Sequence, residues 1–395
     1  MGFYNMQKGD APLFKSLADQ YTMSDNYHQP VMGGTAVQHT MMMTGDALPW
    51  EHVGTFPAVP PTAQVADPTP KSATDVGFKV DGRWTRCDPT SPSNKPIFDY
   101  LKSLSWRPDQ TASNCQTGTY YMINNTRPGF LSNGALNTSA INAGTAVPPS
   151  SLRTIGDALN EKKISWAYYG GGFNAARRFD NGSTDPIDVL IGTGGDWYCD
   201  ICNSFQYSAS IMGNPVQRAA HIKDFTDFFN DVENGQLPAV SYLKPDSFDD
   251  GHPASSKPSI LEALIKRVIT SVKSDDELFN STAIFITFDE GGGYWDSGFF
   301  QPIDFFGDGP RIPFIVVSAY STGGRIVHSY GDHASVLKFI ERNWELKPLT
   351  SRSRDNLPNP TQTSANPYVP TNMPAVGDLF DMFDFSHHEG SNSQH

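Results

Sequence analysis

Hydrophobic periodicity is clearest in the C-terminal half of the chain. Apolar residues recur at helical spacing over 217–232, and the short apolar run at 237–243 is typical of a buried strand. The segment SILEALIKRVITSV, at 259–272, carries one apolar face. It is followed by TAIFITF at 282–288, a continuous run that predicts a strand buried on both faces. These segments indicate two successive helix and strand units.

Two more segments extend this pattern. IPFIVVS, at 312–318, predicts a third buried strand, and Asp332 has the position of an N-cap before a helix that carries Leu337 and Ile340. Ser259 and Glu262 have the spacing of a capping box at the start of their helix. Alternating strands and helices predict an α/β protein with a mostly parallel sheet and helices on both of its sides.

The regions before and after these units have a different character. Residues from about 47 to 214 are dense in Pro, Gly, Ser, Thr and Asn. Long irregular stretches in a compact protein are usually functional, so we expect an insertion or lid over the sheet, or else a surface decoration held by disulfides. We assign residues 1–350 to one domain and expect 351–395 to form an extended, poorly ordered tail.

Composition narrows the possible classes of protein. Aromatic residues make up 12% of the chain and charged residues only 18%, which indicates a folded protein. The 29 basic and 42 acidic residues give a net charge of −13, which argues against a nucleic-acid binder. No apolar run approaches the roughly 20 residues of a membrane span. The N-terminus lacks the pattern of a signal peptide, but the remainder is typical of a secreted or periplasmic protein.

That expectation depends on the cysteines and on four Asn-x-Ser/Thr sequons. The sequons begin at Asn124, Asn137, Asn181 and Asn280, and would be glycosylation sites if they did not arise by chance. The cysteines are Cys87, Cys115, Cys199 and Cys202. One CxxC pair is too few ligands for a structural zinc site, and its surroundings do not match a thioredoxin-like motif. Disulfides 87–115 and 199–202 are the simplest arrangement, although three connectivities are open.

Candidate chemistry follows the predicted strands, because open α/β sheets bind ligands at the carboxyl ends of their strands. The strand at 282–288 leads directly into Asp289 and Glu290, followed by three glycines. Two adjacent carboxylates at the end of an apolar strand repel each other unless a cation compensates them, and a divalent metal ion would do so. The alternative is that one acid caps the next element and the other faces solvent.

Two other loops carry acids and imidazoles. Asp249, Asp250 and His252 follow the strand at 237–243, and could bind a metal, transfer a proton or form a solvated turn. His328 and the pair Asp332 and His333 precede the last predicted helix. A histidine at a helix N-terminus tends to stay neutral, which suits a ligand or a hydrogen-bond donor.

The N-terminal segment NYHQPVMGGTAVQHT offers a nucleophile. Thr35 follows two glycines at the predicted start of a helix, and His39 lies one turn later. A hydroxyl among the exposed N–H groups of a helix N-terminus can attack phosphorus while those groups hold phosphoryl oxygens. The same sequence is also a common N-cap pattern.

Five ordered segments together carry a family resemblance: LADQYTMSDNYHQPVMGGT, LPAVSYLKPDSFDDGHPASS, FITFDEGGGYWDSG, DFFGDGPRIPFIVVSAYSTGG and HSYGDHASVLKFIERNW. The chain resembles the phosphoesterase family of bacterial phospholipases C and acid phosphatases, in the alkaline-phosphatase-like superfamily. The resemblance implies an α/β/α sandwich that hydrolyses phosphate esters with a divalent metal ion. It implies Thr35 as nucleophile and Asp289 and Glu290 as metal ligands.

The remaining roles implied by the resemblance concern the histidines and Asp332. His252 and His333 would be catalytic, as ligands or partners of the phosphate oxygens. Asp332 would orient His333 or join the metal shell. We expect His39, Asp250 and Arg177 to contact substrate.

The aromatic segment ISWAYYGGGFNAARR, which contains Arg177, allows two readings. Trp166, Tyr168 and Tyr169 would either bind a choline-like ammonium by cation–π contact or pack a small core.

The chain departs from the family in one respect. Family members begin with a strand and a Glu-Asn segment that helps to hold the metal, and we find no such segment here. We therefore expect a phospholipase C-like phosphodiesterase, with an acid phosphatase as the alternative. A third possibility is a non-catalytic relative that binds phospholipid head groups or surface glycans.

Overall fold

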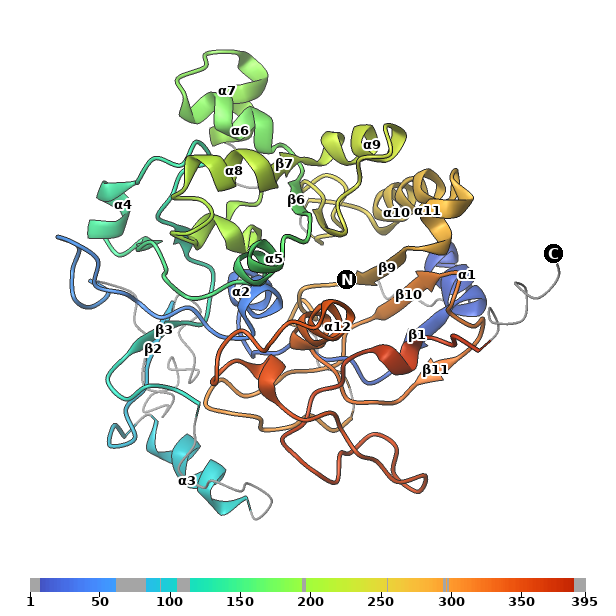
Figure 1. Ribbon diagram of the computed structural model, residues 1–395. Coiled ribbons are helices and arrows are strands. Elements are labelled where there is room, and N and C mark those ends of the chain that lie inside the picture. Colours follow the sequence, from blue (N-terminus) through green and yellow to red (C-terminus); the bar gives the residue numbers. More distant parts are fainter. Residues whose placement is uncertain are drawn as a thin grey trace.

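The computed structural model describes residues 8–61, 83–92, 94–104, 114–193, 197–253, 255–293, 296 and 298–386. Figure 1 shows the arrangement of the helices and strands. The elements before residue 210 are α1 (Pro12–Gln20), β1 (Thr22–Ser24), α2 (Thr35–Thr44), β2 (Trp84–Arg86), α3 (Lys95–Ser103), β3 (Tyr120–Met122), β4 (Arg127–Pro128), α4 (Thr138–Asn142), β5 (Ala146–Val147), α5 (Ile155–Lys162), β6 (Trp166–Gly170), α6 (Phe173–Asp180), α7 (Pro186–Thr193), η2 (Asp200–Cys202) and η3 (Ser204–Tyr207).

The second half of the chain supplies α8 (Pro215–His221), β7 (Ile222–Asp224), α9 (Phe225–Glu233), β8 (Val240–Lys244), α10 (Pro258–Lys273), α11 (Asp276–Asn280), β9 (Ala283–Thr287), β10 (Phe314–Ser318), β11 (Ile326–Val327), α12 (Ala334–Trp344), η4 (Arg354–Asn356) and η5 (Phe380–Met382). The strands that we expected at 237–243, 282–288 and 312–318 are β8, β9 and β10.

One sheet is mixed in direction and has the strand order β11-β1-β10-β9. β10 runs antiparallel to β1 on one side and to β9 on the other, and β11 runs parallel to β1. The side chains of β10 alternate between two helical layers. Ile315 and Val317 pack with α1 and α10, whereas Phe314 and Val316 pack with α12. Because successive strand residues point to opposite faces, this sheet is the middle of three layers, α/β/α.

A second sheet is entirely parallel and has the order β7-β6-β8. Its central strand, β6, is buried at every position. β6 lies within the stretch 47–214 that we expected to be an insertion, so part of that stretch belongs to the core. The α/β class is confirmed, and the parallel pairing is concentrated in this sheet rather than in one continuous parallel sheet.

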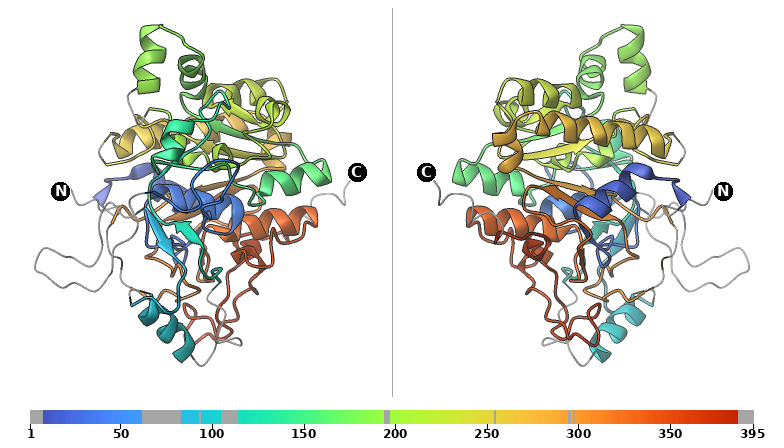
Figure 2. Two further views of the ribbon diagram at one scale, coloured as in Figure 1. Left: turned by 90° about the vertical axis from the view of Figure 1, so that its left-hand side faces the viewer. Right: turned by 90° about the vertical axis from the view of Figure 1, so that its right-hand side faces the viewer.

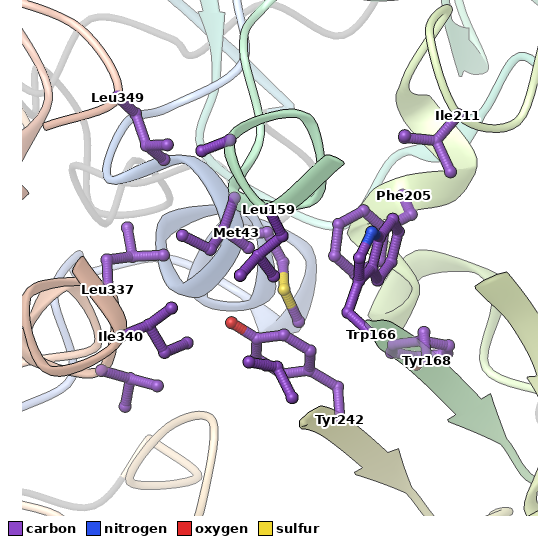
Figure 3. Packing of buried hydrophobic residues seen from close by; sticks show 14 of the residues in the cluster. Met43, Leu159, Trp166, Tyr168, Phe205, Ile211, Tyr242, Leu337, Ile340 and Leu349 are labelled. Atoms are coloured by element: carbon purple, nitrogen blue, oxygen red, sulfur yellow. The ribbon is translucent and has the colours of Figure 1, made fainter. Parts of the chain in front are cut away.

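Helix α2 lies among other helices, in contact with α12, α5, η2 and η3. Its residues are buried almost all the way round, which is typical of a helix inside a protein rather than on its surface. Figure 3 shows Met43 of α2 among Leu337 and Ile340 of α12, Leu159 of α5, and Tyr242 of β8. The first residue of this central helix is Thr35.

The prediction of a single helix over 217–232 was wrong. Two helices, α8 and α9, are separated by β7, where Ile222 pairs with Tyr168 of β6. Asp224 then caps α9, and its side chain accepts the N–H of Thr226 at 3.1 Å. The sheet pairing of a β-branched residue has outweighed the helical periodicity of the segment.

The capping box expected at Ser259 and Glu262 was also wrong. The N-cap of α10 is Lys257, and its side chain makes no capping hydrogen bond. Glu262 instead accepts the N–H groups of Leu13 and Phe14, at 2.8 and 3.0 Å. These groups belong to the first turn of α1, so Glu262 satisfies the N-terminus of a neighbouring helix.

Burial differs from expectation in two places. Each residue of β9 is partly exposed rather than buried on both faces, because β9 is an edge strand that pairs with β10 alone in its sheet. Within 351–386, the segments 353–355 and 375–383 are packed against the domain rather than forming part of an extended tail, whereas most of 361–369 is exposed. Arg354, Val376 and Met382 are each at most 1% exposed. Residues 387–395 of the expected tail lie outside the described residues.

Two disulfides confirm the simplest pairing, Cys87 with Cys115 and Cys199 with Cys202. Among the helices of the described residues, none has the length and apolar character needed to cross a membrane.

Candidate active site

Thr35 is presented by a tight turn of two glycines at the start of α2. Gly34, the N-cap, is extended, with φ −85° and ψ 179°. A Cβ at Gly33 would lie 2.1 Å from the carbonyl oxygen of Ile123, and one at Gly34 would lie 2.3 Å from Oδ1 of Asn124. The backbone around Thr35 therefore needs glycine for space, because the segment at 123–125 passes directly against it.

The same segment completes the N-terminus of α2. Gly34 has no side chain to cap the helix, and Oδ1 of Asn125 accepts the N–H of Ala36 at 3.0 Å. Sequence reasoning missed Asn125. Nothing local distinguishes it, because it lies about 90 residues from Thr35 and only the fold brings the two together.

The two carboxylates that follow β9 lie beside this turn. Thr35 donates its hydroxyl hydrogen to Oε1 of Glu290 at 3.3 Å. Burial, with the nearby charge of Asp289 as a second cause, raises the pKa of Glu290 to about 7. The structure thus places Thr35 next to the two carboxylates of Asp289 and Glu290, as the sequence predicted.

His39 lies one turn along α2 and faces Asp289. Its Nε2 is 3.9 Å from Oδ2 of Asp289, and among the described residues this buried nitrogen has no hydrogen-bond partner. Burial lowers the pKa of His39 to about 4, so the ring is neutral at pH 7.

His333 is held in a fixed tautomer. Its Nε2 lies 2.8 Å from the carbonyl oxygen of Asp289, which can only accept, so Nε2 carries the hydrogen. Nδ1 then accepts the hydroxyl of Tyr27 at 3.1 Å. Burial lowers the pKa of His333. With both ring nitrogens bonded, His333 positions the backbone of Asp289.

Asp332 is fully buried in an ion pair. Arg354 donates from Nη1 to Oδ2 of Asp332 at 3.2 Å and also binds Asp304 through two nitrogens, at 2.8 and 3.0 Å. Oδ1 of Asp332 accepts the N–H of Ala334, the first residue of α12. The structure therefore places Asp332 in a buried ion-pair network behind the site.

A cavity of about 1070 Å³ opens above Thr35, Asp289 and Glu290. Asp250 and His252 line it from the loop after β8, where we expected them. Asp250 accepts a hydrogen bond from Nζ of Lys244 at 3.0 Å, and its Oδ1 accepts the N–H of His252.

Sequence reasoning missed the cations of this cavity. Lys244, Arg83 and Arg127 all contribute to its lining. Lys244 is the last residue of β8. Its position at the carboxyl end of a strand is the feature of the sequence that could have indicated a role in ligand binding.

Other expected residues lie elsewhere. Arg177 is on the exposed face of α6, where it donates to Asn174, and it is not among the residues that line this cavity. Trp166, Tyr168 and Tyr169 are each at most 2% exposed, so they pack the core. His328 pairs with Asp25 at 2.7 Å outside the cavity.

Several side chains around Thr35 are possible ligands of a metal ion. The carboxylates of Asp289 and Glu290 and the unpaired Nε2 of His39 are of the kinds that divalent cations bind. Within the part of the chain that the structure describes, however, three or more such side chains do not gather into a group that could hold a metal ion. The side chains of Asp289, Glu290 and His39 are therefore of the right kind to bind a divalent cation, but they are too few to complete its coordination shell.

Comparison with known proteins gives a consistent result. The Phosphoesterase family profile matches residues 1–347. The chain is 28% identical to a non-hemolytic phospholipase C of Burkholderia pseudomallei over 60% of this chain and 36% of that protein. It is 27% identical to a probable acid phosphatase of Kluyveromyces lactis, over 64% and 56%. It is 22% identical to a hemolytic phospholipase C of Pseudomonas aeruginosa, over 87% and 40%.

The chain thus spans between about a third and just over half of the length of these relatives. A solved structure of a protein in the alkaline phosphatase superfamily from Vibrio parahaemolyticus matches 85% of this chain and 60% of its own, with 11% identity and a TM-score of 0.35.

Proposed function

Because the chain belongs to the phosphoesterase family, we propose that it hydrolyses phosphate esters, with Thr35 as nucleophile. The observation that carries this proposal is the Thr35 hydroxyl at the N-terminus of α2, hydrogen-bonded to Glu290 at the base of a cavity. The relatives include phospholipases C and acid phosphatases, which both cleave bonds between oxygen and phosphorus.

The first step is attack by Oγ1 of Thr35 on phosphorus, with transfer of its proton to Glu290. A raised pKa of about 7 lets Glu290 take this proton near neutral pH. The bond from phosphorus to the ester oxygen breaks as the bond to Oγ1 forms. Apart from that of Ala36, which donates to Asn125, the N–H groups at the start of α2 would face the phosphoryl oxygens, where their partial positive charge would stabilise added negative charge.

The second half of the reaction releases the product. His252, exposed on the cavity wall, would give a proton to the departing alkoxide. Water then attacks the phosphorylated Thr35 and gives its proton to His252, while Oγ1 of Thr35 leaves with the proton held by Glu290. Phosphate or a phosphorylated head group is released, and both side chains return to their starting states.

Lys244 and Arg127 hold the anionic substrate by charge. Asp289, with Nε2 of His39 at 3.9 Å, would hold a divalent cation, which would supply further positive charge for the phosphoryl group. In this proposal Glu290 is the base rather than the metal ligand that the resemblance implied.

We favour a phosphodiester of the phospholipase C type over a monoester. The cavity of about 1070 Å³ is far larger than a phosphate group needs, and Phe130, Ile191 and Tyr198 give its wall an apolar part. The two disulfides support a location outside the reducing cytosol.

The test compares release of a chromophore from an aryl phosphate and from its phosphocholine diester, with and without added divalent metals. Thr35→Ala should lower kcat by roughly a thousandfold or more, and Thr35→Ser should retain activity, because only a hydroxyl can form the covalent intermediate. Thr270→Ala, on the exposed side of α10, is the matched control. Unchanged turnover by Thr35→Ala would refute the proposed nucleophile, and absent turnover by the folded wild type would favour a non-catalytic binder.

A further inference from the structure

Helix α7 reverses the usual distribution of apolar and charged side chains. Ile187, Val189 and Leu190 are 49%, 36% and 45% exposed, whereas Asp188, the one charged residue of the helix, is 2% exposed. A surface helix normally turns its apolar residues to the core and its charges to water. The outward side of α7 is therefore apolar and uncharged.

The inward side of α7 is fixed by specific contacts with α6. Arg178 binds both carboxylate oxygens of Asp188, at 2.7 and 2.9 Å, and Ser183 donates to the same group at 2.7 Å. A Cβ at Gly192 would lie 2.2 Å from the ring of Phe179, so the two helices are in close contact. These contacts hold the apolar side of α7 outward.

Helices α6 and α7 project from the body of the molecule. Figure 1 shows α7 as the outermost element on its side, and both views in Figure 2 show the pair standing out from the rest. A projecting, uncharged helix can reach a flat surface without obstruction from its neighbours.

The same helix borders the candidate active site. Ile191 and Gly192, in its last turn, line the cavity above Thr35. A second apolar group lies near the cavity: Phe248 is 43% exposed and contacts the ring of Trp197, with 3.7 Å between centroids. Ser247, next to Phe248 in the chain, and Tyr198, next to Trp197, also line the cavity.

We propose that Ile187, Val189 and Leu190 of α7 dock the protein on a lipid surface made of zwitterionic lipids, which presents phosphodiester head groups to the cavity. This inference builds on the proposed phosphoesterase site and names its substrate class. Insertion of apolar side chains into the acyl boundary is favourable because it removes their surface from water. A net charge of −13 disfavours anionic surfaces.

The experiment measures flotation of the protein with phosphatidylcholine vesicles and with vesicles that contain phosphatidylglycerol. Ile187→Asp combined with Leu190→Asp should reduce the partition coefficient on phosphatidylcholine by about tenfold or more, because two charges would enter the interface. Ile326→Asp is the matched control, since Ile326 is 50% exposed on β11, away from α7. Hydrolysis of a water-soluble aryl phosphate is measured in parallel.

The expected result is loss of flotation by the double variant alone, with hydrolysis of the soluble ester unchanged. Failure of the folded wild type to float, or equal loss in Ile326→Asp, would overturn the docking proposal. A dimer in solution that the double variant converts to a monomer would assign α7 to a second copy of the chain and would overturn it too. Flotation without any turnover would uphold docking and refute the proposed function.

Discussion

A single amide decides how Thr35 is presented. Because Gly34 cannot cap α2, the N-terminus of the helix depends on Oδ1 of Asn125 from a distant loop. That cap fixes the backbone immediately after Thr35. Asn125 also lines the cavity, so it is both a helix cap and a cavity residue.

We expect Asn125→Ala to lower kcat by about tenfold with a smaller change in KM, because loss of a cap costs roughly 0.5–2 kcal/mol and releases the turn that orients Thr35, the proposed nucleophile. Asn125→Asp keeps the accepting oxygen and should preserve more of kcat, while its charge raises KM for an anionic ester. Steady-state kinetics on an aryl phosphate checks both.

Asn214→Ala provides the control for this pair of variants. Asn214 caps α8 by accepting the N–H of Val216, so its removal costs a comparable cap at a site outside the cavity lining. It should lower the melting temperature without changing kcat. An equal fall of kcat in both alanine variants would argue against a positioning role for Asn125.

The sequence located the chemistry at the residue scale where a local pattern marks it. Thr35 after two glycines, and Asp289 and Glu290 at a strand end, stand out in the sequence alone, and the fold brings them together; their catalytic roles remain predictions. Asn125 and Arg354 could not be found in this way. Each acts on a partner far along the chain, and an isolated asparagine or arginine carries no local signal.

At the scale of the element, α12 carries an unusual buried acid. Glu341 is 5% exposed, and among the described residues its Oε1 has no hydrogen-bond partner. Burial, and then the carboxylate of Asp355, raise the pKa of Glu341 to about 9. The folded protein therefore holds a proton on Glu341 at neutral pH that the unfolded chain releases.

The sign of the pH dependence follows from this difference. Between pH 4.5 and 9 the folded state binds more protons than the unfolded state at this residue, so the free energy of unfolding falls as pH rises. Glu341→Gln removes this contribution. From pH 5 to pH 8 we expect the variant to gain roughly 1–3 kcal/mol over the wild type, measured by urea unfolding.

Glu345→Gln, at the C-cap that follows the same helix, is the matched control, because Glu345 is exposed. Its stability relative to the wild type should stay nearly constant over this pH range. A constant difference for Glu341→Gln as well would show that Glu341 is ionised in the folded protein.

Elements were predicted well where the hydrophobic pattern matched their surroundings, and poorly where contacts between elements decided the outcome. The strands at β8, β9 and β10 agree with their apolar runs. The prediction of one helix over 217–232 was wrong because three residues of this segment pair with β6 in a sheet. The prediction of a capping box was wrong because Glu262 forms its hydrogen bonds with α1.

For the molecule as a whole, Arg354 joins segments from both ends of the chain. It binds Asp304 and Asp332, and it donates to the carbonyl oxygen of Pro30 at 2.6 Å, just before the turn that presents Thr35. Burial alone lowers the pKa of Arg354, but the two carboxylates outweigh this effect and raise it. The guanidinium therefore stays charged in the core.

We expect Arg354→Met to destabilise the protein by about 3–5 kcal/mol, because it leaves Asp304 and Asp332 buried without a counter-charge. Arg342→Met is the control: Arg342 is 55% exposed and pairs with Asp378, so its loss should cost about 1 kcal/mol or less. Urea unfolding measures both. Equal stability of the two variants would contradict the role assigned to Arg354.

The position of Arg354 along the chain also bears on how the protein is made. Synthesis from the N-terminus adds Asp304 and Asp332 before Arg354. Until Arg354 arrives, closing the core would bury two uncompensated carboxylates, which costs several kcal/mol for each ion. We therefore expect the growing chain to stay open until the segment that carries Arg354 emerges.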